Sequence, residues 1–134
     1  MATNTHFWLK FNHGVEIGAR LAYIGHFKRT GEAGIHHIIQ EELGHQEDLK
    51  TVLAENDTTS NYFIDLAFTL IGYSIQFLCK FMPLWSLDLV AQIMEHFAVY
   101  NYRKLAKLYP EYDQMWQDMA TAEERHAVYF KRVP

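Results

Sequence analysis

The stretches Glu42-Leu43-Gly44-His45 and Glu123-Glu124-Arg125-His126 carry the same Glu-x-x-His spacing. On an α-helix, residues three positions apart lie on one face, so each stretch points a carboxylate and an imidazole at one target. A single upstream glutamate, Glu16 or Glu95, precedes each pair. Two such pairs with two further glutamates form the ligand pattern of a carboxylate-bridged two-metal site inside a four-helix bundle.

The expected turns support this pattern. Two residues of an antiparallel hairpin reach the same level only when the turn lies midway between them in the sequence. In the first half of the chain this midpoint is residue 29, beside the helix-breaking stretch Thr30-Gly31-Glu32-Ala33-Gly34. In the second half it is residue 109, at Tyr109-Pro110, where the proline itself indicates a turn. We therefore expect each hairpin to bring its single glutamate level with its Glu-x-x-His pair.

The composition predicts one all-α domain over residues 1–134. The chain is 49% hydrophobic, enough for one core, and its three prolines and seven glycines leave long uninterrupted helices. Alternating runs of Val, Ile and Thr are absent from the sequence. We expect two antiparallel hairpins joined by a crossover over residues 56–86 that carries an extra apolar helix. The first helix is expected to begin between Asn4 and Asn12 and to end near Arg29, and the others to span residues 34–55, 62–81, 86–108 and 110–131.

Local residues predict several helix boundaries. The polar run over residues 56–61 ends the second helix and offers cap residues to the third. Pro83 ends the third helix or kinks the chain, and Ser86 is expected to cap the fourth.

Charge and cysteine content narrow the functional classes. Sixteen acidic and twelve basic residues give a net charge of −4 without a basic cluster, which argues against a nucleic-acid partner. A single cysteine, Cys79, cannot form an internal disulfide and fits a reducing compartment. The first residues lack the pattern of a secretory signal, so we expect a cytoplasmic location.

Six side chains are predicted to hold the metals. Four carboxylates and two imidazoles suit two iron ions, with manganese as the alternative, because carboxylates bridge and imidazole completes each coordination sphere. Zinc is disfavoured because its structural sites favour thiolates. The predicted ligands are Glu16, Glu42, His45, Glu95, Glu123 and His126.

Tyr23 and Tyr102 lie seven residues after the two single glutamates, two helical turns further along the same face. A resemblance to a known family implies that they are candidate catalytic residues lining a substrate pocket. Packing of the two rings in an aromatic core is the equally weighted alternative.

The third helix contains an uncharged run from Leu66 to Cys79. A membrane-spanning helix needs about 20 apolar residues, so this run is too short. Three interpretations stay open: burial as the crossover helix, an interface in a homo-oligomer, or peripheral membrane contact through residues 62–85.

The stretch from Asn12 to His26, with its His, Glu, Gly-Ala and Tyr-x-Gly elements, resembles the first-helix segment of the demethoxyubiquinone hydroxylase family. This family belongs to the wider ferritin-like di-iron group. Both Glu-x-x-His pairs, and Glu95 followed by Tyr100-Asn101, match later motifs of the family. The resemblance implies a ferritin-like bundle in which two ferrous ions activate dioxygen and a ring is hydroxylated.

The leading expectation is therefore a di-iron monooxygenase that takes dioxygen, a small hydrophobic or quinone-like substrate and electrons from an unidentified donor. One alternative is an iron-handling protein, a ferroxidase or storage subunit, which would assemble into a large homo-oligomer. The other is a helical interaction module without metal.

Overall fold

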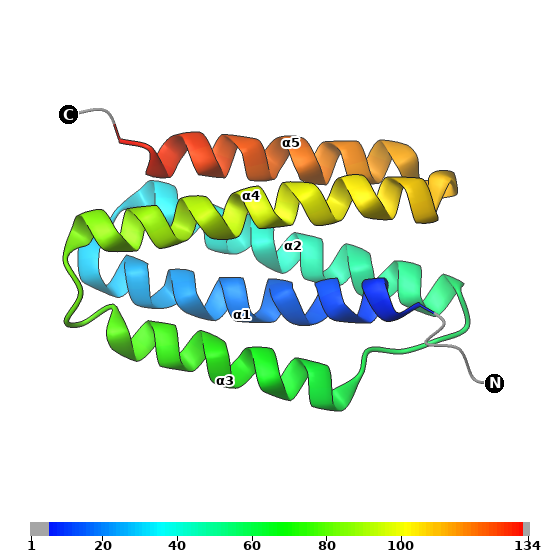
Figure 1. Cartoon of the computed structure of the whole chain (residues 1–134), viewed down its shortest axis with the longest axis horizontal. Coiled ribbons are helices and arrows are strands. Elements are labelled where there is room, and N and C mark those ends of the chain that lie inside the picture. The colour runs from blue at the N-terminus through cyan, green and yellow to red at the C-terminus, as the bar shows by residue number, and fades with distance from the viewer. Residues whose placement is uncertain (1–5, 133–134) are drawn as a thin grey trace. The chain divides into compact units, whose positions relative to one another are not determined.

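The computed structural model describes residues 6–132, and every regular element among them is helical. The predicted all-α class is confirmed. Asn4, the earliest expected start of the first helix, lies outside the described residues. The elements, labelled in Figure 1, are α1 (Phe7–Thr30), α2 (Ala33–Glu55), α3 (Tyr62–Leu78), α4 (Leu84–Leu108), the short 3-10 helix η1 (Pro110–Tyr112) and α5 (Asp113–Phe130).

The chain divides into two compact units, Met1–Lys80 and Phe81–Pro134. In the first unit α1 packs against both α2 and α3 and lies between them (Figure 1). In the second unit α4 packs against α5. Each unit thus contains one of the two predicted hairpins. A single domain over residues 1–134 stays a prediction.

The first hairpin turns at Gly31. This residue has φ 68°, a left-handed conformation that glycine adopts without steric cost, and its N–H donates to the Phe27 carbonyl at 2.7 Å. The next helix, α2, begins only two residues later at Ala33. The predicted break is confirmed, but it is shorter than the five-residue stretch expected from sequence.

The caps of α3 and α4 differ in how well the sequence predicts them. Asn61 caps α3, since its side chain accepts a hydrogen bond from the Ile64 N–H at 3.0 Å. The prediction that Ser86 caps α4 is wrong. The helix begins at Leu84, directly after Pro83, whose fixed φ suits a helix start, and the Ser86 hydroxyl instead donates to the Pro83 carbonyl at 2.6 Å.

Glycines bring α1 and α3 into close contact. A Cβ atom added to Gly25 would lie 2.6 Å from the Cα atom of Gln76, and one added to Gly72 would lie 2.8 Å from the Cβ atom of Leu21. Nearer the start of both helices, Nδ1 of the buried His13 lies 3.0 Å from Oδ1 of Asp65. The two helices therefore run parallel, and small residues form much of their interface.

The packing of α3 leaves most of this helix exposed, so burial as a crossover helix, one of the three interpretations left open by the sequence, does not describe it within one chain. Gly72 is its only fully buried residue, and most of its large apolar side chains are exposed. A helix that uses small residues for packing leaves its large residues on the opposite side.

Candidate metal-binding half-sites

The first half-site lies in the first unit, where α1 supplies Glu16 and α2 supplies Glu42 and His45. All three side chains are buried. The His45 Nδ1 atom lies 3.9 Å from a carboxylate oxygen of Glu16 and 3.9 Å from one of Glu42. One donor atom from each of the three residues lies within 4.8 Å of the others, a spacing that one metal ion can bridge.

The second half-site lies in the second unit and repeats this arrangement. Helix α4 supplies Glu95, and α5 supplies Glu123 and His126, all buried. The His126 Nδ1 atom lies 3.1 Å from Glu123 Oε2 and 3.5 Å from Glu95 Oε2. Their donor atoms also fall within 4.8 Å of one another.

Each hairpin therefore brings its single glutamate beside its Glu-x-x-His pair, as the turn midpoints predict. The first turn lies at Gly31 and the second at η1, close to the expected positions 29 and 109. All six predicted ligands are placed in two groups of three, one in each unit. The predicted spacing and the observed distances agree within each hairpin.

The charge of each half-site favours a cation. Two carboxylates and one imidazole are buried together, and burial of two carboxylates at one place is costly. A divalent ion would offset this cost. Two oxygen donors and one imidazole nitrogen suit iron or manganese, whereas the thiolates that a structural zinc site favours are absent from both groups. The side chains present thus fit the predicted ions.

Neighbouring charged residues have other partners. Glu41 pairs with His37 one turn earlier on α2, and Glu124 pairs with Arg103 across the second hairpin. The half-buried Glu41 and the exposed Glu124 directly adjoin buried ligands. They provide natural controls for substitutions at Glu42 and Glu123.

Asp88, on α4 seven residues before Glu95, has a basic neighbour. Its Oδ2 atom lies 3.0 Å from the Arg132 Nε atom, near the end of the described chain. His96, which follows Glu95, is exposed, because it lies about 100° around the helix from that buried glutamate.

The candidate catalytic tyrosines are both buried in helix interfaces. Tyr23 lies on α1, and Tyr102 on α4 stacks on Trp116 of α5, with ring centroids 6.2 Å apart and 15° between the planes. This stacking is the aromatic packing that the sequence left as the alternative to a pocket. A catalytic role for the two residues stays a prediction.

Two features were missed by the sequence reasoning. Asn101 on α4 is buried, and neither polar atom of its amide has a hydrogen-bond partner among the described residues, an unusual state for a buried amide. The one feature of the sequence that pointed to Asn101 was the motif shared with the family, in which Tyr100-Asn101 follows Glu95. The other feature is a cationic cleft between α1 and α3. No local sequence motif predicts this cleft, because its lining residues come from two segments about fifty positions apart in the chain.

The observations define a class: an all-α chain with two buried clusters of two glutamates and one histidine. Comparison with known protein families, curated proteins and solved structures found no match to this chain. Among residues 6–132, every helix falls short of the length or apolar character needed to cross a membrane.

Proposed function

We propose that the chain binds two iron ions through six protein donors and uses them to activate dioxygen. One observation carries the proposal: two separate hairpins each bury the same trio of two glutamates and one histidine with donor atoms within 4.8 Å. A single buried cluster can arise as an ion-pair network. The same trio recurs in a second hairpin, where the single glutamate again lies level with its Glu-x-x-His pair. This repetition favours a specific pair of metal sites.

In this proposal Glu16, Glu42 and His45 hold one ion, and the corresponding residues of the second unit hold the other. When bound, ferrous iron supplies the electrons and open coordination positions for dioxygen chemistry. The protein residues fix the donor geometry and exclude water from the donors, since all three side chains of each trio are buried.

The proposed reaction is hydroxylation of a small hydrophobic or quinone-like substrate, with electrons from an unidentified donor. The resemblance of residues 12–26 to the demethoxyubiquinone hydroxylase family supports this choice. Tyr23 and Tyr102 are proposed to line the substrate pocket.

The decisive test is the metal content of protein purified without oxygen and loaded with ferrous iron. We expect two irons per chain in the wild type, and loss of bound iron in Glu42→Gln and Glu123→Gln, because each change replaces a charged donor by a neutral amide. The matched controls Glu41→Gln and Glu124→Gln alter the neighbouring outward carboxylates and should keep both ions.

The stoichiometry also tests the bridged pair expected from sequence. If carboxylates bridge the ions, Glu42→Gln removes both irons. If each trio holds its own ion independently, the same variant retains one. Wild-type protein that binds well under one metal per chain, with a folded helical spectrum, would contradict the proposal and leave the metal-free interaction module as the better interpretation.

A second candidate function is iron handling by an assembled oligomer. Helix α4 exposes Trp85, Leu89, Ile93 and Phe97 at intervals of four residues, an apolar stripe that favours self-association. A ferroxidase or storage subunit uses the same ligands inside a large homo-oligomer. Native mass measurement distinguishes the two functions, because only iron handling requires that assembly.

A further inference from the structure

One cleft of the first unit, between α1 and α3, is lined by cationic side chains and by none of the predicted metal ligands. Its volume is about 470 Å³, a size typical of small-molecule sites. Helix α1 contributes Lys28 and Arg29, and Lys80 follows α3. Residues 1–80 contain only six Lys and Arg residues against nine Asp and Glu residues, so half of the cations of this acidic segment line one cleft.

The helix termini reduce this positive charge without cancelling it. Both α1 and α3 end beside the cleft, and each C-terminus carries a partial charge of about −0.5. No acidic side chain lines the cleft among the described residues. The two termini therefore offset about one of the three positive charges, and the remaining excess of about two favours an anion of similar charge.

One end of the cleft is fixed where the two helices stop. Arg29 donates a hydrogen bond to the Cys79 carbonyl at 2.8 Å and so joins these ends. Burial raises the pKa of the Cys79 thiol, and the nearby Arg29 guanidinium only partly opposes that effect. The thiol therefore stays protonated at neutral pH and adds no negative charge to the cleft.

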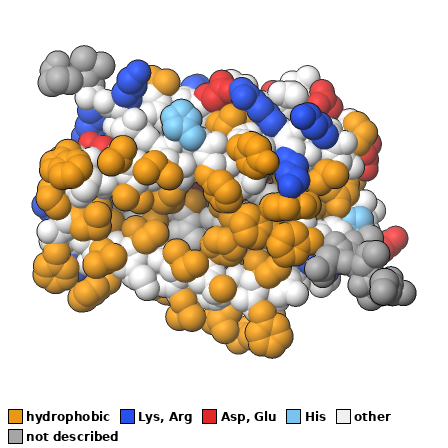
Figure 2. All heavy atoms as spheres, viewed as in Figure 1, with side chains coloured by type: hydrophobic (Ala, Val, Ile, Leu, Met, Phe, Trp, Pro, Cys, Tyr) orange, Lys and Arg blue, Asp and Glu red, His pale blue; other side chains and the backbone are white. Residues whose placement is uncertain are grey.

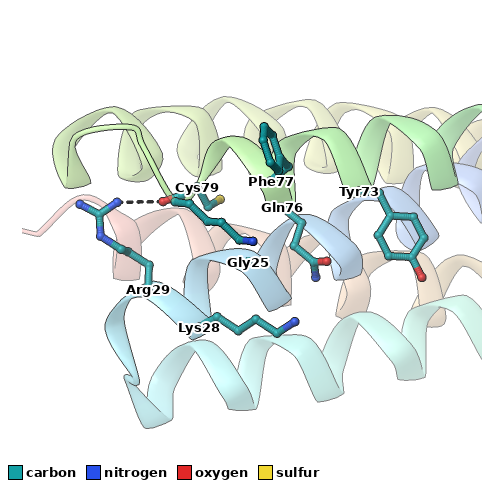
Figure 3. A pocket seen from close by; sticks show the side chains of 8 residues that line it. Gly25, Lys28, Arg29, Tyr73, Gln76, Phe77 and Cys79 are labelled. Carbon is teal, nitrogen blue, oxygen red and sulfur yellow. Dashed lines mark hydrogen bonds between the residues drawn. The ribbon is translucent and has the colours of Figure 1, made fainter.

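Polar side chains extend from both helices into the same groove (Figure 3). They are Lys28 of α1 and Tyr73 and Gln76 of α3, and the two residues of α3 share a face because they lie three positions apart. The Gln76 amide donates to the Leu21 carbonyl at 3.3 Å, which holds this side chain against α1. Tyr73 is 55% exposed, so its ring and hydroxyl are accessible to a ligand.

The cleft and the apolar outer face of α3 lie on different sides of this helix. Phe77 points away from the groove, as its position about 100° around α3 from Gln76 requires (Figure 3). Figure 2 shows hydrophobic side chains over the visible part of α3, at the lower edge of the view. A ligand in the cleft therefore contacts the flank of α3 that faces α1, and we expect it to be a molecule that binds from aqueous solution.

The cationic end of the cleft and the Tyr73 ring are separated along α3. Tyr73 lies seven residues before Lys80, about 10 Å along the helix axis. The cleft thus combines concentrated positive charge, where the helices stop, with an accessible aromatic ring further along. This arrangement fits a ligand that carries two charges on one group and a ring at its other end, whereas an aliphatic dicarboxylate separates its charges.

We propose that this cleft binds a soluble phosphate monoester that carries a planar ring. Such a phosphate has a charge of about −1.5 to −2 at neutral pH, close to the positive excess of the cleft. Lys28 and Lys80 bind the phosphate oxygens, and the ring lies against Tyr73. The Lys80 ammonium lies 5.7 Å from the centre of the Phe77 ring, a weak exposed contact that a phosphate can replace.

Isothermal titration calorimetry with the purified chain, prepared without metal, tests this proposal separately from the proposed di-iron function. The probes are three phosphate monoesters with different rings: adenosine monophosphate, flavin mononucleotide and pyridoxine phosphate. We expect saturable binding of at least one of them. The double variant Lys28→Gln, Lys80→Gln should weaken that binding at least roughly tenfold, because two charged hydrogen-bond donors are lost.

Matched variants control for net charge and test the aromatic contact. The control Lys50→Gln, Lys107→Gln removes two exposed charges elsewhere and should bind like the wild type. Tyr73→Ala should weaken binding of the probe and leave binding of inorganic phosphate unchanged. Tyr62→Ala alters an exposed tyrosine at the start of α3 and should change neither. All the altered side chains are exposed, so every variant should keep the helical circular dichroism of the wild type.

Four outcomes would overturn the proposal. The first is the absence of saturable binding for all three probes. Equal weakening by both double lysine variants would indicate non-specific attraction. Inorganic phosphate that binds as tightly as the probes, or a probe that Tyr73→Ala leaves unaffected, would remove the ring from the ligand. Binding confined to vesicles that contain phosphatidic acid would assign the cleft to a lipid headgroup. None of these results depends on bound metal, so the di-iron proposal is tested independently.

Discussion

At the scale of single residues, Gly25 and Gly44 form a matched pair. Both lie inside helices, so alanine at either site gains about 0.5–1 kcal/mol of helix propensity. Gly44 has no atom within 4 Å of an added Cβ, whereas at Gly25 the Cα atom of Gln76 would lie only 2.6 Å away. We expect Gly44→Ala to stabilise the chain and Gly25→Ala to destabilise it by about 1–3 kcal/mol through overpacking.

Urea denaturation followed by circular dichroism measures both changes in the free energy of unfolding. Since the propensity gain is common to the two variants, their difference reports the clash between α1 and α3. Equal stability of the two variants would show that α3 can move away from α1 without cost, and the glycine interface would then have no energetic role.

At the scale of the element, Asn61 is the cap on which the start of α3 depends. Its side chain accepts the Ile64 N–H, one of the donors that the first helical turn leaves without a partner. We expect Asn61→Ala to lower the free energy of unfolding by about 1 kcal/mol and to speed amide hydrogen exchange in the first turn of α3. Asn61→Asp keeps an acceptor and serves as the control. Unchanged exchange in the alanine variant would contradict the assigned cap.

Helix boundaries were predictable where one residue imposes a local rule. Three boundaries depend on the backbone or side chain of the boundary residues themselves: Gly31, Asn61 and the Tyr109-Pro110 turn. The sequence therefore predicts the position of each boundary to within a few residues. Ser86 failed as a cap because Pro83 starts the helix earlier, a competition between two local signals.

The outward orientation of α3 was not predictable from its own sequence. An apolar run looks the same whether its large side chains face inward or outward. The direction is set by Gly25 and other glycines of α1, and by the single Gly72 on α3 itself. These residues meet only after folding, as do Arg29 and Cys79 at the cationic cleft. By contrast, the trios were predictable because their ligands obey helical spacing within one hairpin.

At the scale of the whole molecule, the open question is whether the two units act as one metal-binding body. The six predicted ligands divide equally between the units, three in Met1–Lys80 and three in Phe81–Pro134. Bridging carboxylates, as expected from the sequence pattern, would make the ions common to both units. Loss of a ligand in one unit would then weaken the metal-bound state of the other.

Hydrogen exchange with peptide resolution can detect this coupling. We expect manganese, a redox-stable substitute for ferrous iron, to slow exchange in α2 and in α5 of the wild-type chain, because metal bound to the folded state opposes local opening. In Glu42→Gln, whose altered residue lies in α2, the metal-dependent protection of α5 should also disappear. Glu41→Gln should retain protection in both helices. If Glu42→Gln loses protection in α2 alone, each unit holds its ion independently, and the bridged pair is wrong. Protection should also decline as the pH falls, since protons compete with the metal for carboxylate and imidazole donors.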